Sequence, residues 1–197
     1  MGIVMRLGLL AGLALAAGPA AAQDLGLAAA QKLFEAKRHV ESLDRLQDAI
    51  ETVSSAMPLT VRTAQLIEDA RGYGSYAARA SNVFKPDDTV KLYAEPLGYG
   101  FRRNGDFYEA ELAGDIALKT AGGQILLTQK DFARFPISSR RRVRELYLTI
   151  SYAYRNLAPG DYAIVTTLRD VVSGKSADFE VPIKVAGPER RTGKQAD

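Results

Sequence analysis

The sequence predicts an α+β fold in which an N-terminal α-helical hairpin is followed by an antiparallel β-sandwich. Before Gly74, apolar residues recur every three or four positions, which places them on one face of a helix. After Gly74, apolar residues alternate with polar ones, and turn residues interrupt them at roughly regular intervals, as in a series of short strands. The chain has no cysteine, so burial and hydrogen bonding must stabilise the fold without disulfides.

The helical region is predicted over residues 23–74. A long amphipathic helix is expected from Asp24 to Met57, and Pro58 cannot continue it from inside because proline lacks an N–H group. Proline suits the first turn of a new helix, so a second helix is expected from Leu59 to Arg71, with Gly72 as its stop. The apolar face of the first helix needs a surface to cover. Two alternatives remain open, which are docking on the sandwich and pairing with another chain in a coiled coil, as a homo-oligomer.

The β-sandwich is predicted over residues 75–186. Its strands are expected at 90–94, 108–118, 125–127, 146–154, 162–168 and 177–185. Pro182 removes one donor from the last strand, which favours a position at the edge of a sheet. About seven short strands with no helices between them are typical of a sandwich.

Two stretches resemble the strand and turn sequences of immunoglobulin-like domains in bacterial exported proteins. These are Phe84-Lys85-Pro86-Asp87-Asp88 leading into Leu92-Tyr93-Ala94-Glu95, and Pro159-Gly160-Asp161-Tyr162 leading into Leu168-Arg169-Asp170 and Ser173-Gly174-Lys175. The resemblance covers roughly residues 76–185. It implies an immunoglobulin-like sandwich and transfers no functional residues. The cysteine pair and tryptophan of antibody domains are absent.

The first residues predict a secretory signal peptide over 1–22. Arg6 precedes an apolar run at 7–17, and small residues at Ala20 and Ala22 suit cleavage before Gln23. The apolar run is well short of the roughly 20 residues that span a bilayer, and no later segment is long and apolar enough to do so. The mature protein is therefore expected in the periplasm or secreted. Residues 187–197 are polar and are expected to be disordered.

Composition argues against several classes of function. The net charge of +3 is small and mixed along the chain, which disfavours nucleic acid as the main partner. With no cysteine and a single histidine, His39, a zinc site of cysteine and histidine is excluded. His39 is expected on a helix surface and not in a catalytic site. No cofactor, no metal site and no enzymatic activity are expected.

Two arginine-rich segments form the candidate binding site. If they lie side by side, exposed aromatic rings and guanidinium groups make a surface for a protein or an anionic envelope polymer. The other reading is that these arginines only limit aggregation at strand ends. The candidate residues are Tyr99, Phe101, Arg102, Arg103, Arg140, Arg141, Arg142 and Arg144.

A rival hypothesis is a carbohydrate-active hydrolase that uses the carboxylates of Glu109, Glu111 and Asp115. Glycoside hydrolysis needs two carboxyl groups on either side of the scissile bond, and alternation places Glu109 and Glu111 on one face of a strand. The same alternation also explains them as a solvent-facing side. A third alternative is a structural envelope protein with no discrete ligand. The favoured prediction is a non-enzymatic binding or assembly module.

Overall fold

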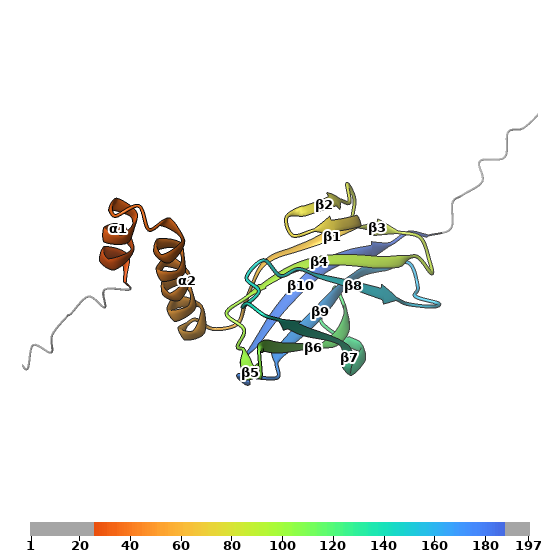
Figure 1. Cartoon of the computed structure of the whole chain (residues 1–197). Coiled ribbons are helices and arrows are strands. Elements are labelled where there is room, and N and C mark those ends of the chain that lie inside the picture. Colours follow the sequence, from red (N-terminus) through yellow and green to blue (C-terminus); the bar gives the residue numbers. More distant parts are fainter. Residues whose placement is uncertain (1–25, 188–197) are drawn as a thin grey trace, which may run out of the picture. The chain divides into compact units, whose positions relative to one another are not determined.

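The computed structural model describes residues 26–187 and contains two helices followed by ten strands in that range (Figure 1). The chain divides into two compact units, one up to Ile50 and one from Glu51 onward. The predicted signal peptide with its cleavage site, and residues 188–197 of the predicted tail, lie outside the described residues.

The helices are α1 (Leu27–Glu35) and α2 (His39–Ala56). The expected single helix from 24 to 57 is wrong, because the chain turns at Lys37, whose φ is 59°. The N–H of Arg38 donates to Leu33 O and the N–H of Lys37 to Phe34 O, both at 2.9 Å, which is the pattern of a Schellman turn. The helical hairpin therefore forms with its corner at Lys37 and not at Pro58. No helix in residues 26–187 is long and apolar enough to cross a membrane.

The predicted second helix, from Leu59 to Arg71, is also wrong. Thr60–Gly72 is a strand, β1, which pairs antiparallel with β4 (Thr89–Leu97). The register shifts between Val61 and Ala64 and again between Ile67 and Asp69, and the adjacent residues Leu66 and Ile67 are both buried, so the strand lacks a plain two-residue period. The sheet region therefore begins at Thr60, ahead of the predicted change at Gly74.

The strands form two sheets. The first has the order β2-β1-β4-β8, and the second has the order β3-β10-β9-β6-β5, with β7 also paired to β6. All pairs are antiparallel except β3 with β10. The remaining strands are β2 (Ser75–Ala78), β3 (Val83–Phe84), β5 (Arg102–Asn104), β6 (Phe107–Thr120), β7 (Ile125–Ser139), β8 (Leu148–Ala153), β9 (Gly160–Asp170) and β10 (Ser176–Val185).

The expected edge position of the last strand needs correction. β10 pairs with β9 along its whole length and with β3 on its other side. The pairing with β3 involves only Lys184 and Val185, so Pro182 lies where that side of β10 has no strand partner.

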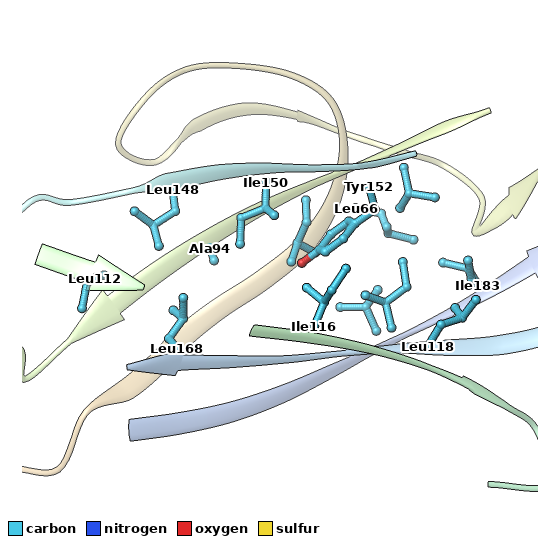
Figure 2. Close-up of a cluster of buried hydrophobic side chains, with 14 of the residues drawn as sticks. Leu66, Ala94, Leu112, Ile116, Leu118, Leu148, Ile150, Tyr152, Leu168 and Ile183 are labelled. Atoms are coloured by element: carbon cyan, nitrogen blue, oxygen red, sulfur yellow. The ribbon is translucent and has the colours of Figure 1, made fainter. Parts of the chain in front are cut away.

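The two sheets share one apolar core, which gives a sandwich-like α+β fold (Figure 2). Alternate residues of β8 are buried, as its period-two pattern predicts, and Leu148, Ile150 and Tyr152 point into the core. From the second sheet, Leu112 and Leu168 are fully buried against them. Each such side chain contributes about 1.5 to 3 kcal/mol relative to an exposed one.

Candidate functional site

A tight hairpin between β5 and β6 places arginines opposite aromatic residues. Asn104 pairs with Phe107 and Arg103 with Tyr108, across a two-residue turn in which Gly105 has a φ of 55°. The two central residues are Gly105 and Asp106, and glycine at the first central position favours such a turn because it adopts positive φ without strain. On β7, Ser139 also pairs with Tyr108, so the segment that begins at Arg140 reaches the same end of β6. The two predicted segments therefore come together.

Guanidinium groups from both segments lie over the two aromatic rings. The Cζ atom of Arg103 lies 4.8 Å from the centroid of the Tyr108 ring, and that of Arg142 lies 4.4 Å from it. Arg140 lies over Phe107 at 5.1 Å. Arg103 also donates a hydrogen bond of 2.9 Å to the Tyr108 hydroxyl. We call this group the arginine surface: Arg102, Arg103, Phe107, Tyr108, Arg140, Arg141, Arg142 and Arg144.

The arginine surface extends over both sides of the β5–β6 hairpin. Successive side chains of a strand point to opposite faces, so Phe107 and Tyr108 face opposite ways. Arg140 accompanies Phe107 on one face, whereas Arg103 and Arg142 accompany Tyr108 on the other. The surface thus wraps around the end of the hairpin.

The expectation that Tyr99 and Phe101 are exposed is wrong. Tyr99 is only 6% exposed, and its hydroxyl donates to the carbonyl oxygen of Val143 at 2.5 Å. Burial raises the pKa of Tyr99, so its phenol stays protonated and remains a donor. Phe101 is half-buried and packs against the core. The accessible aromatics are Phe107, which is 41% exposed, and the half-buried Tyr108, neither of which was predicted.

Positive charge is in excess on the arginine surface. Arg102 is paired with Glu109 at 2.9 Å, and Arg140 lies 3.4 Å from Asp106. Arg142 and Arg144 share the single carboxylate of Glu51. Arg103 has no carboxylate partner among the described residues, and Arg141 is exposed. Three carboxylates therefore face six guanidinium groups.

A buried carboxylate fixes the backbone that leads into β5. Asp170 is 1% exposed and accepts hydrogen bonds from the N–H groups of Gly100 at 2.6 Å and Val172 at 2.9 Å, and from the Ser173 hydroxyl. Gly100 stands two residues before Arg102. The β9–β10 turn is thereby tied to the start of the arginine surface.

A lysine holds the neighbouring chain segments. The Lys175 ammonium donates to the carbonyl oxygens of Ser55 and Met57 at 2.8 Å and of Gly98 at 3.0 Å. Gly98 has a φ of 80°, and a Cβ at this position would lie 2.4 Å from Pro58 O. The close approach therefore requires glycine at 98.

The three carboxylates of the hydrolase hypothesis are each engaged with arginine. Glu111 pairs with Arg134 at 2.6 Å, and Asp115 accepts two hydrogen bonds of 3.0 Å from Arg169. Hydrogen bonds from Asn104 and Arg102 lower the pKa of Glu109, and the hydrogen bond from Arg169 lowers the pKa of Asp115. Lowered values favour permanently ionised groups and not the protonated acid that glycoside cleavage needs.

A groove of about 410 Å³ lies beside two of these carboxylates, those of Glu109 and Glu111. Arg102, Glu109 and Glu111 line it together with apolar residues that include Ile137 and Val171. Arg102 belongs both to this groove and to the arginine surface, so the two features are continuous.

His39 and metal-ligating residues form no site in the described part of the chain. His39 is exposed at the start of α2, and its ring lies 5.0 Å from that of Phe34. Within residues 26–187 there is no group of three or more His, Cys, Asp or Glu side chains that could hold a metal ion.

Comparisons with known proteins give no family. No protein-family model matches the sequence, and no curated protein matches it. Among solved structures, an alkylpurine DNA glycosylase from Pseudomonas fluorescens, bound to DNA, is similar over 71% of this chain, with 10% identity and a TM-score of 0.35. This chain spans 34% of the glycosylase. The CARDB domain of a Pyrococcus furiosus protein, in complex with di-metal ions, is similar over 66% of this chain and 90% of its own length, with 8% identity and a TM-score of 0.27. Neither likeness carries an argument about function.

Proposed function

We propose that this chain is an exported, non-enzymatic binding or assembly module, whose arginine surface holds an anionic partner in the periplasm or outside the cell. The observation that carries the proposal is the contact of Arg103 and Arg142 with the one ring of Tyr108. The signal peptide predicted at 1–22 supports export. An immunoglobulin-like sandwich, as the sequence resemblance implies, is part of this proposal.

The aromatic contacts favour recognition because they orient the guanidinium groups in advance. The interaction of a cation with an aromatic ring contributes about 0.5 to 1 kcal/mol at an exposed site. This interaction restricts the rotamers of the arginine in the free protein, so binding loses less side-chain entropy. Tyrosine and arginine are also the residues that most often dominate the energy of interfaces. The surplus of guanidinium over carboxylate groups then selects an anionic partner, either a protein or an envelope polymer.

The hydrolase alternative receives no comparable support. Glu109 and Asp115 have lowered pKa values, and a general acid needs a raised one. The alternative of a structural envelope protein without a discrete ligand is tested by the same experiment as the binding proposal.

The test is the binding of the purified chain to poly-L-glutamate, measured by biolayer interferometry at low and physiological salt. We expect the triple variant Arg140→Glu, Arg141→Glu, Arg142→Glu to weaken binding by roughly tenfold or more, because it reverses charges that face the ligand. We also expect wild-type binding to weaken as salt screens the charges. The control is Arg71→Glu, an exposed arginine on β1 in the other sheet.

Equal binding by the triple variant and wild type would contradict the proposal, provided that far-UV circular dichroism shows both proteins folded. Cross-linking of the wild-type and triple-variant chains in intact envelopes then separates a protein partner from a polymer. A cross-linked protein that disappears with the triple variant identifies the former.

A further inference from the structure

The outer edge of β8 is unprotected. β8 (Leu148–Ala153) is the last strand of the sheet order β2-β1-β4-β8 and pairs with β4 at six consecutive positions without a register shift. Among residues 26–187, no strand pairs with its other side, and no loop makes a main-chain hydrogen bond to it. Residues 146–154 contain no charge, no proline and no glycine. Such an edge offers free N–H and C=O groups to another strand.

The other edges of the two sheets carry features that discourage pairing. β7 contains Pro136 and a register shift near Asp131, whose φ is 49°. β2 has only four residues, and its pairing with β1 is irregular at two places. β10 carries Pro182 two residues before its pairing with β3 begins. Proline, bulges and short strands are the usual means by which sheets avoid edge-to-edge association. The absence of all three from β8 therefore marks it as a pairing site.

We propose that β8 pairs antiparallel with β8 of a second copy of this chain, with Ile150 at the two-fold axis. A two-fold rotation perpendicular to the sheet reverses the strand direction and keeps each side chain on its own face. With Ile150 opposite its own copy, Thr149 of each chain lies opposite Ser151 of the other. Thr149 and Ser151 are exposed on the outer face, where Thr–Ser pairs form cross-strand hydrogen bonds.

The charge and the apolar inner face of β8 are also compatible with pairing to a second copy of itself. Because residues 146–154 carry no charge, no like charges meet across the axis. On the inner face, Leu148 lies opposite Tyr152, so the apolar cores of the two chains become continuous along the joined sheet. The pairing occupies the β8 edge of both copies, so no free β8 edge remains and the assembly stops at a dimer. It does not involve the N-terminal helices, which are the other route to an oligomer considered for this chain.

Cysteine cross-linking tests the register. The chain contains no cysteine, so each introduced thiol reports a single position. Residues directly opposite in an antiparallel pair have Cα atoms about 4.5 to 5.5 Å apart, a separation that a disulfide spans. We expect an equilibrated mixture of Thr149→Cys and Ser151→Cys chains to form disulfide-linked heterodimers on oxidation, and each variant alone to form far fewer dimers. Equal cross-linking by the separate variants and the mixture would overturn the proposed register.

Analytical ultracentrifugation tests the interface itself. We expect the wild-type chain to be a reversible dimer, and the double variant Thr149→Lys, Ser151→Lys to raise the dissociation constant roughly tenfold or more, because lysines then lie opposite each other in both pairs. The control is Thr128→Lys, Ser138→Lys, which alters exposed residues of the same types on β7. A monomeric wild type, a dimer unaffected by the β8 variant, or equal effects of the two variants would each overturn the proposal.

Discussion

Replacing Asp170 with asparagine isolates the contribution of one buried carboxylate to the backbone before the arginine surface. One oxygen of this group accepts from Val172 N–H, and the other accepts from Gly100 N–H and the Ser173 hydroxyl. Asparagine has nearly the same shape but replaces one oxygen with an NH₂ group, which donates and cannot accept. Whichever way the amide is oriented, at least one backbone N–H then faces a donor.

The expected loss of stability for Asp170→Asn follows from the one backbone N–H group that is left without an acceptor. A buried donor left without an acceptor costs about 1 to 3 kcal/mol, and the original bonds were made to a carboxylate, so we expect a loss of about 2 kcal/mol for Asp170→Asn. Little of this loss can come from a cavity, because the volume is unchanged.

Urea unfolding followed by far-UV circular dichroism measures the effect. The matched control is Asp178→Asn, an exposed position on β10, which should change the free energy of unfolding by less than about 0.5 kcal/mol. If the two variants were equally stable, Asp170 would not hold the segment before β5 as described. Poly-L-glutamate binding by Asp170→Asn at a temperature where it is fully folded provides a second readout, which should weaken if Gly100 orients the following arginines.

Three further predictions concern stability. Lys175→Met removes three hydrogen bonds from an ammonium group to main-chain carbonyls and should cost about 2 to 3 kcal/mol in urea unfolding, whereas the exposed Lys184→Met should cost less than about 0.5 kcal/mol. Because the pKa of Asp115 is lowered from 3.8, its carboxylate stabilises the fold above that value, and the gain is lost as pH falls through the lowered pKa. Asp115→Asn and wild type should therefore differ in melting temperature at neutral pH and converge in acid; a constant difference would refute this. Burial raises the pKa of Tyr152 to about 12, and its hydroxyl lies 2.7 Å from that of Thr166. Tyr152→Phe should cost about 1 to 2 kcal/mol, and adding Thr166→Val should recover part of this cost; additive losses would show that the two hydroxyls are not coupled.

The strands that bury one face were predictable from the sequence, whereas β7 was expected only at 125–127 and runs to Ser139, because its first seven residues are all exposed and give no alternation. In β8, every second residue is buried, and this two-residue period is visible in the sequence. β1 was missed because its sequence has apolar residues three positions apart at Ala64 and Ile67, as on a helix face, although Ala64 is exposed in the strand. Pairing with β4 determines that β1 is a strand. The spacing of neighbouring residues in the sequence does not reveal such pairing between distant segments.

The break between α1 and α2 was missed for a different reason. A left-handed turn at a helix end usually carries glycine, and here Lys37 occupies it. A lysine at positive φ gives no signal in the sequence, although the hydrogen bonds from Arg38 and Lys37 back to the last turn of α1 are of the ordinary kind.

The candidate site was predicted in part. Arginines at 102, 103, 140 and 142 do gather at one end of β6, but the aromatic partners expected for them were the wrong ones. The sequence contained the signal that could have corrected this, since Gly105-Asp106 favours a two-residue hairpin turn, and a turn with these two central residues sets Tyr108 opposite Arg103. Tyr99 precedes the hairpin and is buried beside Val143, which is 44 positions away, so its local sequence gives no sign of this burial.

The length of β6 has a mechanical consequence. Tyr108 and the core residues Leu112, Ile116 and Leu118 belong to one uninterrupted strand, which is bonded to β7 on one side and to β5 and β9 on the other. A force applied to Tyr108 along the axis of β6 must break many of these inter-strand hydrogen bonds at the same time instead of one after another. A tether attached at the tip of this hairpin would therefore be resisted by the whole second sheet, and not by a flexible loop.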